Sequence, residues 1–286
     1  MKKIVVIGSV NTDIVMFAPF RPNAGECVTA NDFNIISGGK GANQAVSSAR
    51  LGGLVSFIGS VGTDTYGQMA IDDLISNGVD ATGVVKCAEI TGTAIITVAG
   101  GDNSIVVYPG ANTLLLPELI NCDILKDADV IVTQLEIPPE TIEYILKICE
   151  DKTIILNPAP NAREFKQEWM GKINYITPNT QEFDIMFNGE PLERVIKRYP
   201  NKLIVTLGAE GTAYFDGNKI IRIPATDDKP VDTTGAGDTF NGALAVAISE
   251  RMPLYDAVSF ANKAAGISIT KKGCREGMPL RNELNS

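Results

Sequence analysis

The chain has no histidine among its 286 residues. This absence excludes a Ser-His-Asp triad, a Cys-His nucleophile pair, an HExxH zinc site and a histidine general base. Any acid–base chemistry near neutral pH must therefore come from a carboxylate, a lysine, a tyrosine or a cysteine.

Basic runs and long apolar runs are also missing. The chain has 25 Lys and Arg against 34 Asp and Glu, a net charge of −9, and its densest basic group is Lys271, Lys272 and Arg275. Because phosphate-backbone binding needs a basic face, we expect no nucleic-acid partner. No apolar stretch approaches the roughly 18 residues of a membrane helix, so we expect no membrane partner.

Paired cysteines are absent too. The five cysteines stand singly, with no CxxC spacing, at Cys27, Cys87, Cys122, Cys149 and Cys274. Scattered single cysteines are typical of a reducing compartment. The short apolar run near the start meets Asn11 and Asp13 too early for a signal peptide, so we expect a cytoplasmic protein.

What the chain does contain is an alternation of apolar β-branched runs with helix-like spacings. Hydrophobic residues make up 44% of the chain, which is enough for a large core. We predict strands at 3–7, 55–59, 130–133, 153–156, 175–177 and 203–206, and helices at 44–51, 64–77, 139–149, 180–187 and 192–199. This order predicts an α/β fold with a mostly parallel central sheet flanked by helices.

Two stretches, 15–36 and 91–108, interrupt this alternation. Both consist of extended segments with turn residues, and the second has β-rich runs on either side of a turn cluster at 100–103, which indicates a hairpin. We interpret them as a small accessory sheet beside the main one, with edge strands of the main sheet as the alternative, and the pattern alone favours neither. We expect one α/β domain over residues 1–286 with these segments inserted.

The sharpest motif is DTTGAGDTFN at 232–241, which leads into an apolar helical run. Gly235, Ala236 and Gly237 fall where a loop opens a helix, so successive N–H groups and the helix dipole would form an anion cradle. Asp238 follows directly and could take a proton from a hydroxyl. The alternative is a tight turn with Asp238 as an ordinary first-turn residue.

The segment SGGKGANQ at 37–44 is a second candidate. It places Gly39, Lys40, Gly41 and Asn43 at a helix start, where glycines allow close approach of a ligand and Asn43 suits a hydroxyl-rich one. The spacing does not match GxxxxGK[ST], so a Walker-type loop is not supported. A glycine-rich loop with its lysine in solvent is the alternative.

Other polar residues follow strands. Asn11 and Asp13 in GSVNTD come after the first strand and could bind adjacent hydroxyls on one side, although an Asx turn explains them equally well. Glu136 follows another strand, PNTQE carries Asn179 and Glu182, and TLGAEG lies at 206–211. Each of these alone is more often a cap or a turn.

Taken together, these segments resemble the ribokinase-like family of carbohydrate kinases. GSVNTD, SGGKGANQA with ARLGG, GDNSIVVYPGAN, QLEIP, NPAPN, TPNTQE, TLGAEG and DTTGAGDTFNGAL follow the family's order over nearly the whole chain. SGGKGANQA, NPAPN and YPGAN are closer to members acting on ribose than to those acting on adenosine, fructose 6-phosphate or ketodeoxygluconate. The resemblance implies ATP-dependent phosphorylation of the 5-hydroxyl of D-ribose to give ribose 5-phosphate.

The resemblance also implies roles for individual residues. Asp238 would be the catalytic base, with Gly235, Ala236 and Gly237 as the anion hole for the transferring phosphate. The sugar pocket would comprise Asn11, Asp13, Gly39, Lys40, Gly41, Asn43, Glu136 and Asp238. ATP would contact Asn179, Thr206, Leu207, Gly208, Ala209, Glu210, Gly211, Gly237 and Asn262.

Two ions and a partner are implied in the same way. Mg²⁺ would accompany ATP, with Glu182 acting on it indirectly. An activating K⁺ would be held, mostly by backbone carbonyls, at Asp232, Thr234, Ser268, Lys271, Gly273 and Gly277. Gly277 stands where the family has serine, so we expect activation that is present but weaker. The inserted strands would form a lid over the sugar that pairs two subunits in a homodimer.

Three rival interpretations remain open. A sibling kinase would act on deoxyribose, a nucleoside or another small sugar, although a nucleoside needs an apolar surface for its base and the sugar-side motifs are mainly polar. A binding regulator without turnover would be expected to have lost Asp238 or the glycine run. A dinucleotide oxidoreductase would need GxGxxG where the chain has GSVNTD.

Overall fold

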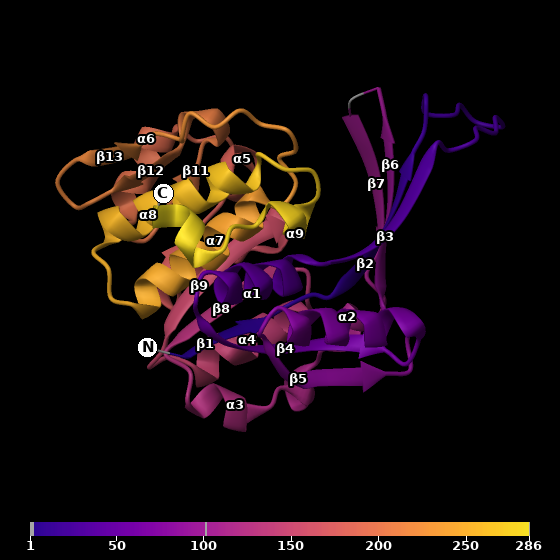
Figure 1. Ribbon diagram of the computed structural model, residues 1–286. Coiled ribbons are helices and arrows are strands. Elements are labelled where there is room, and N and C mark those ends of the chain that lie inside the picture. Colours follow the sequence, from indigo (N-terminus) through magenta and orange to yellow (C-terminus); the bar gives the residue numbers. More distant parts are fainter. Residues whose placement is uncertain (1–2, 101, 286) are drawn as a thin grey trace.

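The computed structural model describes residues 3–100 and 102–285 (Figure 1). Gly101, part of the predicted turn cluster, lies outside the described residues, as do Met1, Lys2 and Ser286.

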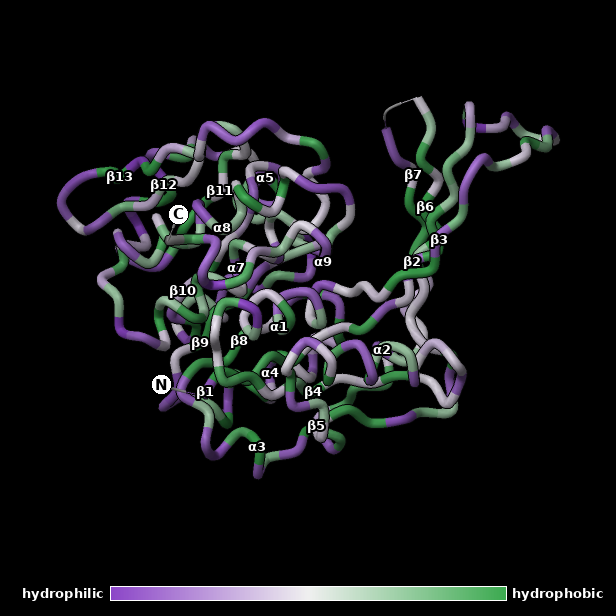
Figure 2. Tube along the Cα trace, viewed as in Figure 1, coloured by the Kyte–Doolittle hydropathy of each residue, from purple (hydrophilic) through white to green (hydrophobic). Residues whose placement is uncertain are grey.

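A six-stranded parallel sheet forms the centre of the molecule, with strand order β10-β9-β8-β1-β4-β5. Its strands are nearly continuous apolar runs, because helices cover both of its faces. Figure 2 shows them as the hydrophobic interior of the chain. Their bounds are Lys3–Ile7 (β1), Leu54–Gly62 (β4), Asp80–Cys87 (β5), Val130–Leu135 (β8), Thr153–Pro160 (β9) and Tyr175–Ile176 (β10). The predicted parallel α/β fold is confirmed.

Successive side chains of β1 point to opposite faces of the central sheet, and each face has its own apolar cluster. Ile4 and Val6 enter one apolar cluster with α1, α2, α7 and α8, whereas Val5 and Ile7 enter a second with α3 to α6. The helices are α1 (Lys40–Arg50), α2 (Thr65–Ser76), α3 (Cys122–Lys126), α4 (Pro139–Ile148), α5 (Thr180–Met186), α6 (Leu192–Val195), α7 (Ala236–Ser249), α8 (Leu254–Ser268) and α9 (Cys274–Gly277). Short 3₁₀ turns include η1 (Gly110–Leu114) and η6 (Gly208–Glu210).

The two interrupting stretches form a separate four-stranded sheet that projects from the body (Figure 1, upper right). Its order is β3-β2-β6-β7, from β2 (Asn11–Phe17), β3 (Asp32–Gly38), β6 (Gly92–Ala99) and β7 (Asp102–Tyr108). We call it the projecting sheet. β2 pairs antiparallel with β3 and parallel with β6, and β6 and β7 form the predicted hairpin. These strands are therefore an accessory sheet and not edges of the central one.

A third sheet of three antiparallel strands was not predicted. It consists of β11 (Val205–Thr206), β12 (Thr212–Phe215) and β13 (Ile220–Ile223). Parallel bridges from Ile176 to Leu203 and from Asn179 to Thr206 join it to the β10 edge of the central sheet. Within the described part of the chain, none of the helices has the length and apolarity needed to span a bilayer.

Candidate active site

The polar residues gather at the carboxyl edge of the central sheet, where β1 and β8 lie side by side. Ser9 follows β1 and Glu136 follows β8, and the Ser9 hydroxyl donates a hydrogen bond to the Glu136 carboxylate. The Lys40 backbone N–H donates to the same carboxylate at 3.1 Å. Ligands of open α/β sheets bind at this edge, so the predicted sugar-side segments meet at the expected place.

The DTTGAGDTFN segment opens α7. Gly235 is the residue before the helix and has a left-handed backbone, φ 78°. A β-carbon there would also collide with the Cys274 sulfur, so the position requires glycine. The N–H groups of Gly237 and Asp238 in the first turn have no acceptor within the helix and lie at its positive end, whereas the Ala236 N–H donates to the Thr233 carbonyl at 3.3 Å. A glycine at a helix start is compatible with the anion cradle, which stays a prediction.

Both oxygens of the Asp238 carboxylate accept hydrogen bonds from α1. The Asn43 amide nitrogen donates to Oδ2 and the Gln44 amide nitrogen donates to Oδ1, each at 3.0 Å. Asp238 is only 6% exposed, so these amides replace water as its partners. The contacts fix the orientation of the carboxylate at the mouth of the cradle and join the second motif to the first.

Asn11 and Asp13 lie on β2 of the projecting sheet and share one of its faces, because they are two residues apart in a strand. They are therefore not part of an Asx turn. The Asn112 amide donates to Asn11 Oδ1 at 2.8 Å and also binds both backbone groups of Val10. Asn112 thereby leaves the amide nitrogen of Asn11 as the end available for a ligand.

The charges around this pocket shift the pKa values of its ionisable groups. Burial raises the pKa of Asp13 to about 6, and Glu136 and Asp238 add to the rise while Arg275 and Lys40 oppose it. Burial alone would lower the pKa of Lys40, but Asp238, Glu136 and Glu182 outweigh it and the pKa is raised. Lys40 therefore stays cationic among carboxylates, and the alternative of a lysine in solvent does not hold.

The nucleotide-side candidates lie along the β10 edge. Asn179 and Glu182 form a capping box at the start of α5, with the Glu182 N–H donating to Asn179 Oδ1 at 2.8 Å and the Asn179 N–H donating to Glu182 Oε2 at 2.9 Å. Burial raises the pKa of Glu182.

The TLGAEG segment makes a closed turn, in which the Leu207 N–H donates to the Gly211 carbonyl at 2.7 Å around η6, the turn that contains Gly208, Ala209 and Glu210. Thr206 pairs with Asn179 across the sheets. The Asn262 amide is engaged in the protein, accepting from the Thr212 hydroxyl and donating to the carbonyls of Ile223 and Pro224. Its contact with adenine stays a prediction.

The two loops predicted to hold K⁺ meet at Asp232. Its carboxylate accepts from the Thr234 N–H at 2.9 Å and from the Gly273 N–H at 3.0 Å. Burial alone would raise the pKa of Asp232, but these hydrogen bonds lower it, so the group is ionised. The Lys271 ammonium lies 3.6 Å from the Glu283 carboxylate. Across the described ranges, no group of three or more Asp, Glu or Cys side chains is arranged to hold a metal ion.

Gly277 packs directly against the Ser268 backbone. A β-carbon at this position would collide with the Ser268 carbonyl oxygen. The serine that the resemblance implies at this position would therefore meet the end of α8 unless the loop shifted.

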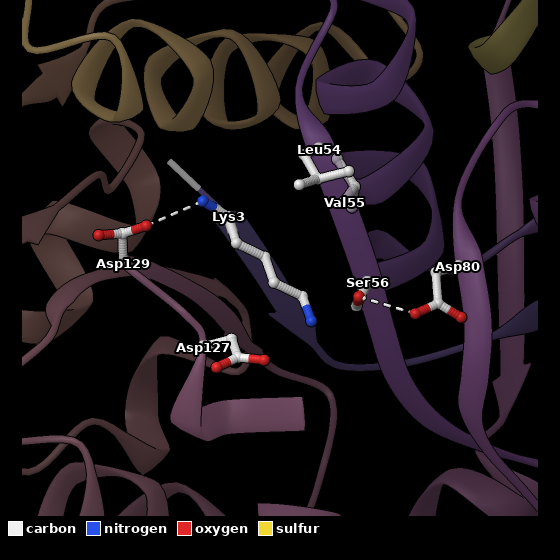
Figure 3. Close-up of a pocket in the computed structure, with 7 residues that line it drawn as sticks. All are labelled: Lys3, Leu54, Val55, Ser56, Asp80, Asp127 and Asp129. Carbon is white, nitrogen blue, oxygen red and sulfur yellow. Dashed lines mark hydrogen bonds between the residues drawn. The ribbon is translucent and has the colours of Figure 1, made fainter. Parts of the chain in front are cut away.

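A hollow of ≈480 Å³ lies at the opposite edge of the central sheet (Figure 3). Lys3, Leu54 and Asp80 begin their strands there, and Asp127 and Asp129 precede β8. Figure 3 shows Ser56 bound to Asp80, and the Lys3 backbone bound to Asp129 at 2.9 Å. Since this is the amino edge of the strands, it is separate from the candidate site.

Known proteins resemble this chain over nearly its whole length. Residues 1–281 match the pfkB family of carbohydrate kinases. The chain belongs to that family. A ribokinase of Bacillus subtilis (strain 168) is 45% identical over 290 residues, covering 99% of this chain and 98% of that protein.

Two solved pfkB-type structures extend the likeness to three dimensions. A ribokinase from Thermotoga maritima has a TM-score of 0.93 at 36% identity, covering 100% of this chain and 98% of that one. A ribokinase from Arabidopsis thaliana complexed with ribose and ATP has a TM-score of 0.87 at 30% identity, covering 99% and 97%. As a pfkB-family carbohydrate kinase, the chain is a phosphotransferase.

Three residues at this pfkB site were missed from the sequence. Gln44 holds Asp238, Asn112 orients Asn11, and Arg275 donates to Asn43 at 2.9 Å. Gln44 and Asn112 stand inside SGGKGANQ and YPGAN, so the motifs themselves were the available signal. Arg275 carried no such signal, because it follows the last motif in a segment of mixed charge.

Proposed function

We propose that this pfkB-family kinase transfers the γ-phosphoryl group of ATP to the 5-hydroxyl of D-ribose, giving ribose 5-phosphate and ADP. The observation that carries the proposal is the tethering of Asp238 by Asn43 and Gln44 at the first turn of α7. It brings a general base, an anion cradle and hydroxyl-binding residues together. The 45% identity to a full-length ribokinase supports ribose as the acceptor.

In the reaction, Asp238 accepts the proton of the 5-hydroxyl as that oxygen bonds to the γ-phosphorus. The bond from the γ-phosphorus to the β–γ bridging oxygen breaks, and its electron pair leaves with ADP. The N–H groups of Gly235 and Gly237 would face the charge on the transferring group, and that of Ala236 would join them on leaving the Thr233 carbonyl, to which it donates in this structure. Positioning and electrostatics supply most of the acceleration in such a transfer.

The sugar pocket would bind adjacent hydroxyls on one face of the sugar ring. Asn11 offers its amide nitrogen as a donor, because Asn112 already binds its oxygen. Asp13 on the same strand face offers a carboxylate as an acceptor. Lys40 and Asn43 from α1, with Glu136 from the end of β8, complete a polar lining together with the close-packed backbone of Gly39 and Gly41.

ATP would lie along the β10 edge against Asn179, Thr206 and the turn 207–211, with Asn262 nearby. Mg²⁺ bound to its phosphates would neutralise their charge. Glu182 fits an indirect part in holding that ion, since one of its oxygens is already bound to the Asn179 N–H and the carboxylate is only 9% exposed.

A K⁺ ion would be held where loop 232–234 meets 268–277. The ionised Asp232 supplies the negative charge, and backbone carbonyls of Thr234, Ser268, Lys271, Gly273 and Gly277 complete the set. The residues fit such an ion, because the Lys271 ammonium is drawn to Glu283 and so leaves only its carbonyl for the role. The ion would stabilise the loop that packs Cys274 against Gly235.

We also propose a cytoplasmic homodimer in which the projecting sheet acts as a lid over the sugar. The outer strand β7 is exposed throughout, and Ile95, Ile105 and Val106 are 47%, 52% and 71% exposed. An exposed apolar sheet of this kind is typical of an interface. All five cysteines are free, which supports a reducing compartment.

A coupled assay of ADP release tests the proposed function. The acceptors are D-ribose, 2-deoxyribose, D-arabinose and adenosine, each in K⁺, Na⁺ and tetramethylammonium, with ³¹P NMR of the product. We expect the highest kcat/KM for ribose, a 5-phosphate product, activation by K⁺ over Na⁺, and loss of that activation in Asp232→Ala.

Each result that differs from these expectations would contradict a different part of the proposal. Equal kcat/KM for ribose and 2-deoxyribose would show that Asn11 and Asp13 do not read the 2-hydroxyl. A preference for adenosine would favour the nucleoside alternative. Saturable ribose binding without any turnover would support a binding regulator. Identical kinetics in all three cations would remove the K⁺ site.

A further inference from the structure

Arg275 is a buried arginine that no motif predicted. It lies in α9, within the C-terminal loop, and is 6% exposed. Its Nε donates to Asn43 Oδ1 at 2.9 Å and one terminal nitrogen donates to the Gly38 carbonyl at 3.3 Å. The other terminal nitrogen pairs with the Asp73 carboxylate on α2. A guanidinium taken out of water needs such a full set of partners.

These contacts determine which way the Asn43 amide faces. An asparagine side chain has an accepting oxygen at one end and a donating nitrogen at the other. Arg275 can only donate, so it holds the Asn43 oxygen and turns the nitrogen toward Asp238, where the 3.0 Å hydrogen bond is formed. A reversed amide would present oxygen to the Asp238 carboxylate, and the two would repel each other.

The backbone around Arg275 is fixed as well. The Arg50 guanidinium donates to the Arg275 carbonyl and to the Met278 carbonyl at 3.3 Å. Cys274, the preceding residue, packs on Gly235 at the start of the anion cradle. One short helix therefore contacts the cradle through Cys274 and the sugar-side residues through Arg275.

We propose that Arg275, anchored by Asp73, is a positioning residue that sets the Asn43 amide and, through it, the Asp238 carboxylate. The C-terminal loop then governs the base and the anion cradle together. This inference deepens the proposed function and rests on it. Arg275 does not touch the reacting atoms in this arrangement and acts through Asn43.

The charge of Arg275 gives a second, separable effect. Asp13 is surrounded by Arg275 and Lys40, which lower its pKa, and by Glu136 and Asp238, which raise it. Removing the Arg275 charge should therefore move the acid limb of kcat/KM for ribose to higher pH. A purely structural role in holding α9 would not move that limb.

The test compares Arg275→Gln, Arg275→Lys, Asp73→Asn and the double variant Arg275→Gln with Asp73→Asn. Arg281→Gln is the matched control, because Arg281 also pairs with a carboxylate, Glu250, and stacks on Phe260 away from the pocket. Melting temperature, kcat, KM for ribose and for ATP, and the pH profile are measured for each.

We expect Arg275→Gln to lower kcat at least about tenfold, since small displacements of reacting groups have large effects on rate. KM for ATP should stay within about twofold. Asp73→Asn should act in the same direction more weakly, and the double variant should be no worse than Arg275→Gln alone, because both changes act on one chain of contacts. Arg275→Lys should recover the acid limb but only part of kcat.

Wild-type kcat and an unmoved acid limb in Arg275→Gln would overturn the inference, as would strictly additive effects in the double variant. If Arg275→Gln does not fold, the kcat of Asp73→Asn decides, because that variant removes the anchor of Arg275 and keeps its charge beside Asp13. Ribose turnover by the wild-type protein is the reference throughout. Its absence would refute the proposed function, whereas an active wild type with an unaffected Arg275→Gln would refute only the role of Arg275.

Discussion

Asp238 is oriented before any substrate arrives. Its two oxygens are held by two amides from α1, and the backbone that follows Gly235 presents it in the first turn of α7. A base fixed in this way loses little freedom when the sugar binds, which is what preorganisation means for a proton transfer.

Asp238→Asn should lower kcat by about 10² to 10⁴, because the acceptor of the hydroxyl proton is lost. The new amide nitrogen would also face the donor of Asn43 or Gln44, so some loss of stability is expected. Steady-state kinetics, with calorimetry of ribose binding, would separate the two effects. Ribose should still bind, and turnover close to that of the wild type would contradict the assignment of Asp238 as the base.

Asp13 is placed for function at a cost in stability. Its pKa of about 6 in the folded protein lies above the value near 3.9 of an exposed aspartate, so the ionised form opposes folding. At ~1.4 kcal/mol per pKa unit the cost is on the order of 3 kcal/mol above pH 6. This cost disappears as the pH falls from 6 toward 4, because the folded protein takes up the proton first.

Asp13→Asn should therefore melt higher than the wild type at pH 7.5, and its advantage should shrink at pH 5. Ribose affinity should fall at least about tenfold, because a charged acceptor is lost. In the wild type, kcat/KM for ribose should fall below about pH 6. Thermal melts at the two pH values and ribose titrations measure these effects, and an advantage independent of pH would show that Asp13 titrates elsewhere.

At the scale of elements, α9 and the end of α8 are packed without room for a side chain. Gly277→Ala would place a methyl group against the Ser268 carbonyl, and such overpacking typically costs about 1–3 kcal/mol. The displacement would also disturb Ser268 and Gly273, so K⁺ activation should weaken. Gly171→Ala is the control, because a β-carbon at Gly171 meets open space.

Urea unfolding and the ratio of rates in K⁺ and Na⁺ measure these two expectations. Equal stabilities for the Gly277 and Gly171 variants would mean that the loop relaxes freely. In that case the serine that the resemblance implies at this position would be accommodated as well.

At the scale of the whole molecule, the projecting sheet extends from the body near the carboxyl edge of the central sheet, where it also contacts α2 and η1 (Figure 1). Both of its insertions leave from that edge, after β1 and after β5. A partner covering its apolar side chains would restrict its movement over the sugar, so dimerisation and sugar closure are expected to be linked.

Val106→Lys should convert the proposed dimer to a monomer and raise KM for ribose. Val106 is 71% exposed on β7, and a lysine there would place charge in the interface. Leu54→Lys is a suitable control, because Leu54 is 60% exposed at the amino end of β4, the edge of the central sheet opposite the projecting sheet. Analytical ultracentrifugation gives the oligomeric state, and a monomeric wild type would contradict the proposal.

The amino-acid sequence by itself determined the local features. The β-branched runs of β1 and β8, the helical spacing of α2 and α4, and the glycine run before α7 are short-range signals, so each was predicted close to its observed bounds. The order of motifs also predicted the family, because each motif depends on neighbouring residues alone.

Only the tertiary structure decided what the motifs do to one another. Arg275 and Asn43 are 232 residues apart, and Asn112 and Asn11 are 101 apart, yet each pair forms a hydrogen bond. The strands β2 and β6 have the same alternating pattern whether they join the central sheet or leave it, so the pattern alone left their accessory sheet undecided and the family resemblance carried that prediction. The reason is that sequence periodicity records which face of an element is buried, whereas pairing between distant elements depends on the packing of the entire chain.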